Sequence, residues 1–241
     1  MRATRFLMAG VLVAGLVVMA EAQPGGGRGF GAFGSGPARL VLNDTVQKDL
    51  KLSEDQIEKV KTWQKEFQAK QFEGFAALKD LSKEERIEKM PAIMAESRKN
   101  AYKDLANVLK PEQINRLKQI ERQAAGVRAF EDPENAAALK LTDSQSSKIK
   151  NILSEFQKDQ REVFGSFAKG GFRKGGFDKD KMAENFKKIE KLEKSAMADI
   201  DETLTADQRK TWKAMTGEPI DRSKLAPGRG GFGRGKNKAK D

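Results

Sequence analysis

Four short motifs with a shared pattern recur along this chain, and each resembles the start of a helix. Three of them read Leu-[Ser/Thr]-x-x-Gln, in which the hydroxyl accepts a hydrogen bond from the N3 amide and the Gln reaches back to the N-cap amide. The other motif has no hydroxyl but places a proline at the first helical position, which also suits a helix start. We therefore expect one helix to begin at each motif. The motif residues are Leu52, Ser53 and Gln56; Leu109 and Gln113; Leu141, Thr142 and Gln145; and Leu204, Thr205 and Gln208.

Apolar residues between these motifs follow a helical period. Ile57, Val60, Trp63 and Phe67, for example, stand three or four positions apart, with charged or polar residues between them. Alternating strand patterns of useful length are missing, so the sequence predicts an all-α fold. Pro91 is expected to kink or split the second helix. The expected helices cover residues near 54–79, 83–108, 111–125, 143–168, 179–203 and 206–215.

The residues between the motifs also repeat. Val60, Trp63, Phe67 and Phe75 stand 89 positions before Ile149, Ile152, Phe156 and Phe164, and residues 101–113 stand 95 positions before their counterparts. The Gly-rich stretch 169–177 lies where the offset changes, as a loop insertion would. We interpret residues 50–123 and 139–215 as a duplicated unit. The expected divisions are a signal peptide (1–22), a Gly-rich disordered segment (23–39), helical repeats (40–125 and 139–217), a linker (126–138) and a basic disordered tail (218–241).

The first 22 residues have the order of a secretory signal peptide. Arg2 and Arg5 precede an apolar run of about 15 residues, and small residues follow it. That run is shorter than the roughly 20 residues that span a bilayer. We expect cleavage after Ala22, a periplasmic or otherwise exported mature chain and no stable membrane insertion; an uncleaved anchor is the alternative.

Composition limits the chemistry of the chain. It has no Cys and no His, which excludes disulfides, thiolate metal sites and Ser–His or Cys–His nucleophile pairs. We expect no enzyme activity, catalytic residue, metal or cofactor, although composition alone leaves carboxylate or Lys catalysis open. The net charge of +11 is concentrated in the tails, because residues 40–221 carry 35 Lys and Arg against 33 Asp and Glu.

With these motifs, the chain resembles the Spy/CpxP-like family of periplasmic chaperones and envelope-stress proteins. The resemblance implies bent helical hairpins that pair into a thin, curved layer and hold non-native polypeptides without ATP. It also implies that the Leu, Ser/Thr and Gln residues of the motifs have an architectural role. Because this chain has two units, we expect a monomeric pseudo-dimer, with a homodimer as the alternative.

Several phenylalanines fall on the predicted helix faces. Most are expected to pack in cores, but a thin helical layer cannot bury both of its faces. We therefore expect some of them to form an exposed apolar patch that binds unfolded or partly folded proteins. The candidates are Phe67, Phe72, Phe75, Phe156, Phe164 and Phe167.

The Arg-, Gly- and Phe-rich tails suggest other functions. They are expected to be flexible extensions, and their charge also suits anionic envelope polymers. No nucleic-acid partner is expected, because the signal peptide directs the chain out of the cytoplasm. The alternatives to a chaperone-like protein are an envelope-stress regulator with one specific partner, or a structural protein that binds anionic polymers through its tails.

Overall fold

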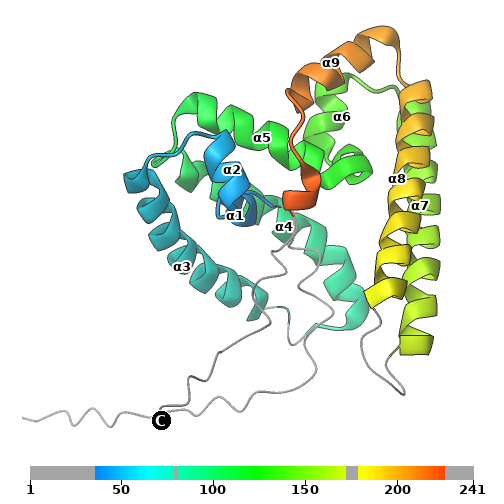
Figure 1. The fold of residues 1–241 in the computed structure, drawn as a ribbon, viewed down its shortest axis with the longest axis horizontal. Helices are drawn as coiled ribbons and strands as arrows, with labels where there is room; N and C mark the ends of the chain where they lie inside the picture. The colour runs from blue at the N-terminus through cyan, green and yellow to red at the C-terminus, as the bar shows by residue number, and fades with distance from the viewer. Residues whose placement is uncertain (1–35, 77, 79–80, 172–178, 226–241) are drawn as a thin grey trace, which may run out of the picture.

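The structure, a computed structural model, describes residues 36–76, 78, 81–171 and 179–225, and within these ranges it contains helices and no strand (Figure 1). The predicted all-α class is confirmed. No helix in the described ranges is long and apolar enough to cross a membrane. The elements are α1 (Pro37–Leu40), α2 (Asp44–Asp49), α3 (Glu54–Ala76), α4 (Lys83–Leu105), α5 (Pro111–Ala125), the 3₁₀ helix η2 (Gly126–Glu131), α6 (Pro133–Leu139), α7 (Asp143–Gly171), α8 (Lys179–Thr203), α9 (Ala206–Thr216) and the 3₁₀ helix η3 (Arg222–Lys224).

The six long helices α3, α4, α5, α7, α8 and α9 lie where the apolar period predicted them. Pro91 was expected to kink or split the second helix. The split does not occur, because α4 continues through Pro91 as one helix. Proline removes the amide that would bond to the carbonyl four residues earlier, which belongs to Ile87. Ile87 is 64% exposed, so water can reach this part of the helix.

Three segments that were expected to lie outside the helical repeats contribute to the fold. The expected linker 126–138 belongs to the second core, because it forms η2 and most of α6 and buries Val127 and Phe130. Residues 37–39 of the expected N-terminal disordered segment form α1. Residues 218–225 of the expected C-terminal tail lie against the first core, where Leu225 is buried. Residues 1–35 and 226–241, which include the expected signal peptide, are outside the described ranges.

Buried apolar side chains form two separate cores. The first core belongs to α1–α5, with Leu225 added from the end of the chain, and the second core belongs to η2–α9. The buried members of the first core are Leu40, Val41, Val46, Leu50, Val60, Leu105, Leu109, Leu117, Ile120 and Leu225. Those of the second are Val127, Phe130, Leu139, Ile149, Leu153, Phe156, Ala196, Ile200 and Leu204.

The two halves share details at the offset of 89 residues. Asn43 caps α2 by accepting from the Thr45 amide at 2.9 Å, and Asp132 caps α6 by accepting from the Glu134 amide at 2.9 Å. Lys51 and Lys140, also 89 positions apart, are the two non-glycine residues in the described ranges with positive φ, at 51° and 52°. We interpret α1–α5 and η2–α9 as two copies of one unit. In this interpretation the expected linker is the beginning of the second copy.

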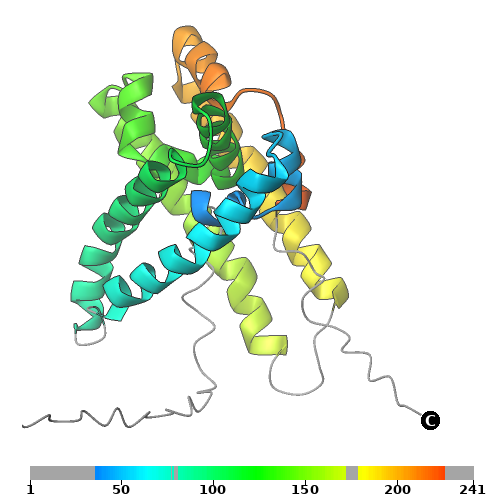
Figure 2. The same cartoon turned by 90° about the vertical axis from the view of Figure 1, so that its left-hand side faces the viewer.

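The long helices extend beyond the cores as two arms. α7 and α8 lie side by side along their length, whereas α3 and α4 run antiparallel but diverge (Figures 1 and 2). In both views the ends of the two helix pairs point toward the same side of the molecule. We call residues 68–76 and 83–94 the first arm, and residues 160–171 and 179–190 the second arm.

The halves join where α5 packs against α9. Side chains of α5 supply donors to carbonyls at the C-terminal end of α9, which have no partner within the helix. Arg122 Nη1 donates to the Met215 carbonyl at 3.0 Å, and Gln123 Nε2 donates to the Thr216 carbonyl at 2.6 Å. The two halves are therefore tied by directed hydrogen bonds at the ends opposite the arms.

Candidate functional site

The motif residues of the first half form one connected hydrogen-bond cluster. Ser53 Oγ accepts from the Gln56 amide at 3.2 Å, and Gln56 Oε1 accepts from the Ser53 amide at 3.1 Å, which completes the predicted capping box. Gln56 also pairs with Gln113, which is 57 residues away. Gln56 Nε2 donates to Gln113 Oε1 at 2.8 Å, and Gln113 Nε2 donates back to Gln56 Oε1 at 3.2 Å. The glutamine pair joins the starts of α3 and α5.

The second half contains the same arrangement. Capping boxes form at Thr142 with Gln145 and at Thr205 with Gln208. Gln145 Nε2 donates to Gln208 Oε1 at 2.7 Å, and Gln208 Nε2 donates to Gln145 Oε1 at 3.0 Å. The capping role was predicted from the sequence, but the pairing of the glutamines between motifs was not. The motif leucines Leu109 and Leu204 are buried in the two cores, while Leu52 and Leu141 pack at their edges.

A fourth capping box, absent from the sequence prediction, opens α4. Ser82 Oγ accepts from the Glu85 amide at 3.2 Å, and Glu85 Oε2 accepts from the Ser82 amide at 2.9 Å. The hydrogen bond from the Ser82 backbone, followed by that from its side chain, lowers the pKa of the Glu85 carboxyl below its usual value. Leu81-Ser82-x-x-Glu85 fits the same pattern when Glu is allowed at N3, so the sequence contained this signal.

The predicted patch of phenylalanines is only partly on the surface. Phe67 is 8% exposed and Phe156 is 6% exposed, so the expectation that these two contribute to a surface is wrong. Phe156 belongs to the second core, and Phe67 packs against the Trp63 ring at 4.9 Å between centroids. Phe72 and Phe164 are exposed, at 63% and 45%. The side chains of Phe75 and Phe167 lie outside the described part of the structure.

Two further exposed apolar side chains were missed. Ile87 on α4 is 64% exposed, and Phe186 on α8 is 53% exposed. Each arm therefore presents two large apolar side chains to solvent: Phe72 and Ile87 on the first arm, and Phe164 and Phe186 on the second. Phe186 stands within a run of Lys and Glu residues, so its isolation on a charged helix was the available sequence signal.

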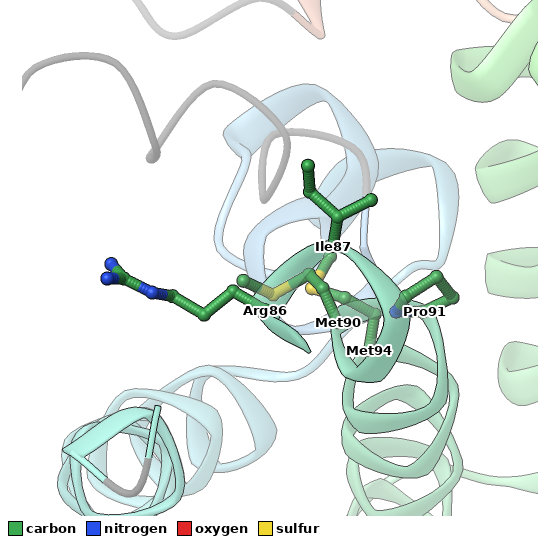
Figure 3. Close-up of a pocket in the computed structure, with 5 residues that line it drawn as sticks. All are labelled: Arg86, Ile87, Met90, Pro91 and Met94. Carbon is green, nitrogen blue, oxygen red and sulfur yellow. The ribbon is translucent and has the colours of Figure 1, made fainter. Parts of the chain in front are cut away.

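A shallow apolar hollow lies on the first arm. It is lined by Arg86, Ile87, Met90, Pro91 and Met94, and Figure 3 shows these side chains on one part of α4. Arg86 Nε donates to the Leu81 carbonyl at 2.9 Å, which fixes the guanidinium at the edge of the hollow. Methionine side chains adapt to partners of different shape. The hollow thus combines adaptable apolar side chains with one cation.

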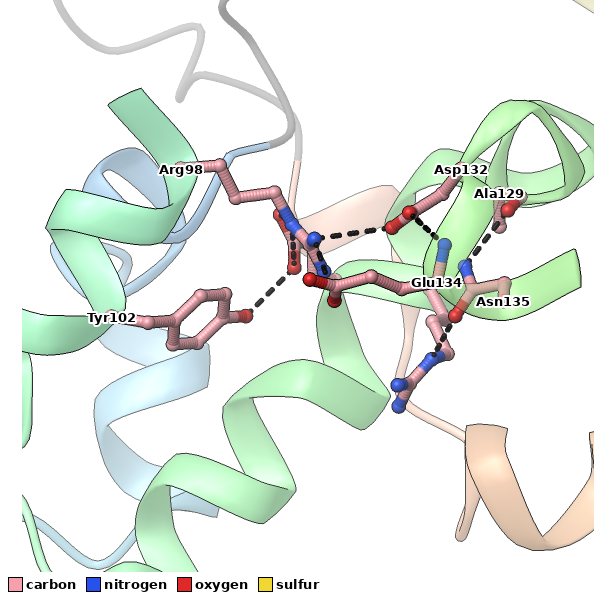
Figure 4. A network of polar contacts seen from close by, with 8 residues as sticks. Arg98, Tyr102, Ala129, Asp132, Glu134 and Asn135 are labelled. Atoms are coloured by element: carbon pink, nitrogen blue, oxygen red, sulfur yellow. Dashed lines mark hydrogen bonds and ion pairs between the residues drawn. The ribbon is translucent and has the colours of Figure 1, made fainter. Parts of the chain in front are cut away.

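Figure 4 shows a polar network that joins the two halves. Arg98 on α4 is the central residue: its Nε lies 2.9 Å from Glu121 Oε1, and its Nη1 lies 3.1 Å from Asp132 Oδ2. Tyr102 Oη donates to Glu121 Oε2 at 2.7 Å. On the other side, Arg122 Nε donates to Asn135 Oδ1 at 2.8 Å. The network links α4 and α5 of the first half to Asp132 and α6 of the second.

The network changes the titration of its members. Burial, followed by the charge of Glu121 and the hydrogen bond to it, raises the pKa of the Tyr102 hydroxyl well above its usual value. Burial alone would lower the pKa of Arg98, but hydrogen bonding and charge from Glu121, with the charge of Asp132, outweigh it and raise that pKa. Both groups therefore remain protonated at neutral pH. Their role is to fix the geometry of the junction.

No metal-binding cluster of three or more His, Cys, Asp or Glu residues occurs in the described ranges. Comparison of the chain with models of known protein families, with curated proteins and with solved structures finds no match in any of the three. The Spy/CpxP-like resemblance therefore depends on the motif residues of the chain alone and stays a hypothesis.

Proposed function

We propose that this chain is an exported, ATP-independent chaperone-like protein that holds non-native polypeptides on its two arms. The observation that carries the proposal is the pair of large exposed apolar side chains on each arm. On the first arm, Ile87 lines one hollow with Met90, Pro91 and Met94, and apolar patches of this kind on a protein surface mark interaction sites. Covering one such side chain contributes about 1.5–3 kcal/mol, so several weak contacts with a client are sufficient for reversible holding.

The remaining surface of the arms supports the same function. Charged side chains stand between the apolar ones on the second arm, and some of them form ion pairs, such as Lys188 with Glu184 at 2.8 Å. The arms are therefore soluble while they expose apolar side chains. Cations such as Arg86 accelerate encounters with acidic clients, and apolar contacts then prolong the complex. Two arms on one chain provide the two binding surfaces that the proposed pseudo-dimer requires.

The test is suppression of client aggregation without nucleotide, measured by light scattering on several unrelated unfolding proteins. The test variant replaces Phe72, Ile87, Phe164 and Phe186 with Ser. A matched control replaces Glu73, Lys89, Glu162 and Lys187, which are exposed on the same arms, with Ser and leaves the net charge unchanged.

We expect the wild type and the control to suppress aggregation at near-stoichiometric amounts, and the test variant to lose most of this effect. Undiminished suppression by the test variant would contradict the proposal. Two other outcomes would favour the alternative functions. Binding of a single partner, with no protection of other clients, indicates a regulator. Salt-sensitive binding to an anionic polymer that requires residues 226–241 indicates a polymer-binding protein.

A further inference from the structure

The last described segment of the chain, residues 218–225, returns from the end of α9 to the first half. We call it the strap. It begins after Gly217, whose positive φ of 62° turns the chain away from α9. It is non-helical except for the single 3₁₀ turn of η3. The strap thus lies on the first half as a short irregular segment that ends in a turn at Leu225.

The first half recognises the backbone of the strap. Arg116 Nη1 donates to the Glu218 carbonyl at 2.9 Å, and Gln123 Nε2 donates to the same oxygen at 2.8 Å. Gln123 Oε1 accepts from the Ile220 amide at 2.8 Å. Asn43 Nδ2 donates to the Lys224 carbonyl at 2.8 Å. These contacts use main-chain atoms that every polypeptide has.

Two strap side chains are recognised by apolar contact. Leu225 is 8% exposed and belongs to the first core, and Ile220 is partly buried and packs against that core. The side chains of Glu218, Pro219, Asp221 and Ser223 are exposed. Arg222, paired with Glu193 at 2.7 Å, is the strap residue with a charged partner outside the strap in the described ranges. The contacts therefore select two apolar residues five positions apart and few other side chains.

Two donors of this site are also held by residues outside the strap. Arg116 is fixed by Asp49, with Nε at 2.6 Å from Oδ1 and Nη2 at 3.0 Å from Oδ2. Asn43 is fixed as the cap of α2. At the repeat offsets, the counterparts of Asn43 and Arg116 are Asp132 and Thr211, which lack this set of donors. The site is therefore a property of the first half.

We infer that this surface is a peptide-binding site, occupied in cis by the strap, that accepts a segment of a non-native client with apolar residues at positions i and i+5 and a single turn between them. The inference rests on the proposed function, since it names a second surface for the same class of partner. In the resting protein the strap competes with clients. A tethered segment acts at an effective concentration of about 1 mM. If the site binds the strap sequence with a Kd of about 100 µM, the tethered strap lowers the apparent affinity for a free peptide about tenfold.

The experiment uses the full chain with the substitutions Ile220→Asp and Leu225→Asp, which release the strap. The probe is a fluorescein-labelled peptide with the sequence of residues 217–227, and binding is measured by fluorescence anisotropy. We expect the released variant to bind the peptide at least about tenfold more tightly than the wild type. A peptide with Asp at both apolar positions should not bind. Adding Gln123→Ala to the released variant should remove most of the gain.

A folded released variant that binds the peptide no better than the wild type would overturn the inference. If that variant does not fold, a protease site inserted after Gly217 separates the strap from the folded wild-type chain. The cleaved strap should then exchange with labelled peptide on dilution, and a folded, cleaved protein that does not exchange it would also overturn the inference.

The aggregation assay separates this inference from the proposed function. Client protection by a protein whose site never takes the peptide leaves the proposed function standing and overturns only the inference. Peptide exchange by a protein that protects no client leaves the peptide-binding site standing and overturns the proposed function.

Discussion

Gln113→Ala is expected to be among the most costly polar substitutions in the first half. The Gln113 side chain is 7% exposed and makes four hydrogen bonds, with the Lys110 amide, the Leu50 carbonyl and both polar atoms of the Gln56 amide group. After truncation, water reaches the Lys110 amide at the helix start, and Gln56 retains its bond to the Val108 carbonyl. The Leu50 carbonyl, 3.1 Å from Gln113 Nε2, loses its side-chain donor in a buried position.

The expected loss follows from these contacts. A hydrogen bond contributes about 1 kcal/mol net, and a buried group left without a partner costs about 1–3 kcal/mol. The free energy of unfolding should therefore fall by about 2–4 kcal/mol. Gln208→Ala is the matched control, because its bond to the Lys140 carbonyl is longer, at 3.3 Å, and exposed. We expect it to cost about 1–2 kcal/mol.

Urea unfolding followed by tryptophan fluorescence measures both losses. Trp63 packs against the first core, and its Nε1 donates to Asp104 Oδ2 at 3.2 Å. Trp212 packs against the second core, with its ring centroid 4.3 Å from that of Phe130. Single-tryptophan variants thus report each half separately. A Gln113→Ala variant within about 0.5 kcal/mol of the wild type, or one less affected than Gln208→Ala, would refute the reasoning.

Three further predictions concern single residues. Gly217→Ala should destabilise the protein by about 1–2 kcal/mol in thermal unfolding, because φ is 62° and the new Cβ would lie 2.3 Å from Gln119 Oε1. Gly165 has open space around it, so Gly165→Ala should be neutral or stabilising in the same measurement. Tyr102→Phe should cost about 1.5–3 kcal/mol, because it removes a hydrogen bond to a charged carboxylate; a loss below about 0.5 kcal/mol in urea unfolding would contradict that role for the network. Since the folded pKa of Tyr102 is raised, its contribution is full below pH 10.0 and is lost as the pH rises above that value, by up to about 1.4 kcal/mol per pH unit. Because the chain has one tyrosine, absorbance at high pH follows this group alone, and an ordinary titration near pH 10.0 in the folded protein would contradict the assignment.

The long helices could be predicted because each repeats its apolar period over several turns, and because α3, α5, α7 and α9 begin at the four repeated motifs. α1, α2 and α6 have 4, 6 and 7 residues, too few turns for a period to be visible. The strap was missed because its two apolar residues, Ile220 and Leu225, stand among charged ones and a proline. Its burial depends on a surface built by residues more than 100 positions earlier, such as Arg116 and Asn43.

The exposure of individual phenylalanines at the candidate site also could not be predicted from the apolar period. Phe67 and Phe72 are five residues apart, which rotates them by about 140° around α3. The period therefore allowed one of them to be buried and the other exposed. The sequence did not show that α7 extends beyond its core, and this extension leaves Phe164 on the surface although it shares the pattern of buried residues. Exposure depends on where the neighbouring helices end, and a single helix does not encode that.

Site-specific crosslinking identifies the surface that contacts a non-native client. A photoreactive amino acid is placed in turn at Phe72, Ile87, Phe164 and Phe186, and at the exposed control positions Glu112 and Asp207 near the helix starts. Each protein is irradiated with a permanently unfolded polypeptide and with the same polypeptide in its folded form. We expect crosslinks to the unfolded form from the arm positions and few from the controls. Equal crosslinking from all six positions, or none from the arms, would contradict the proposal that the arms hold non-native chains.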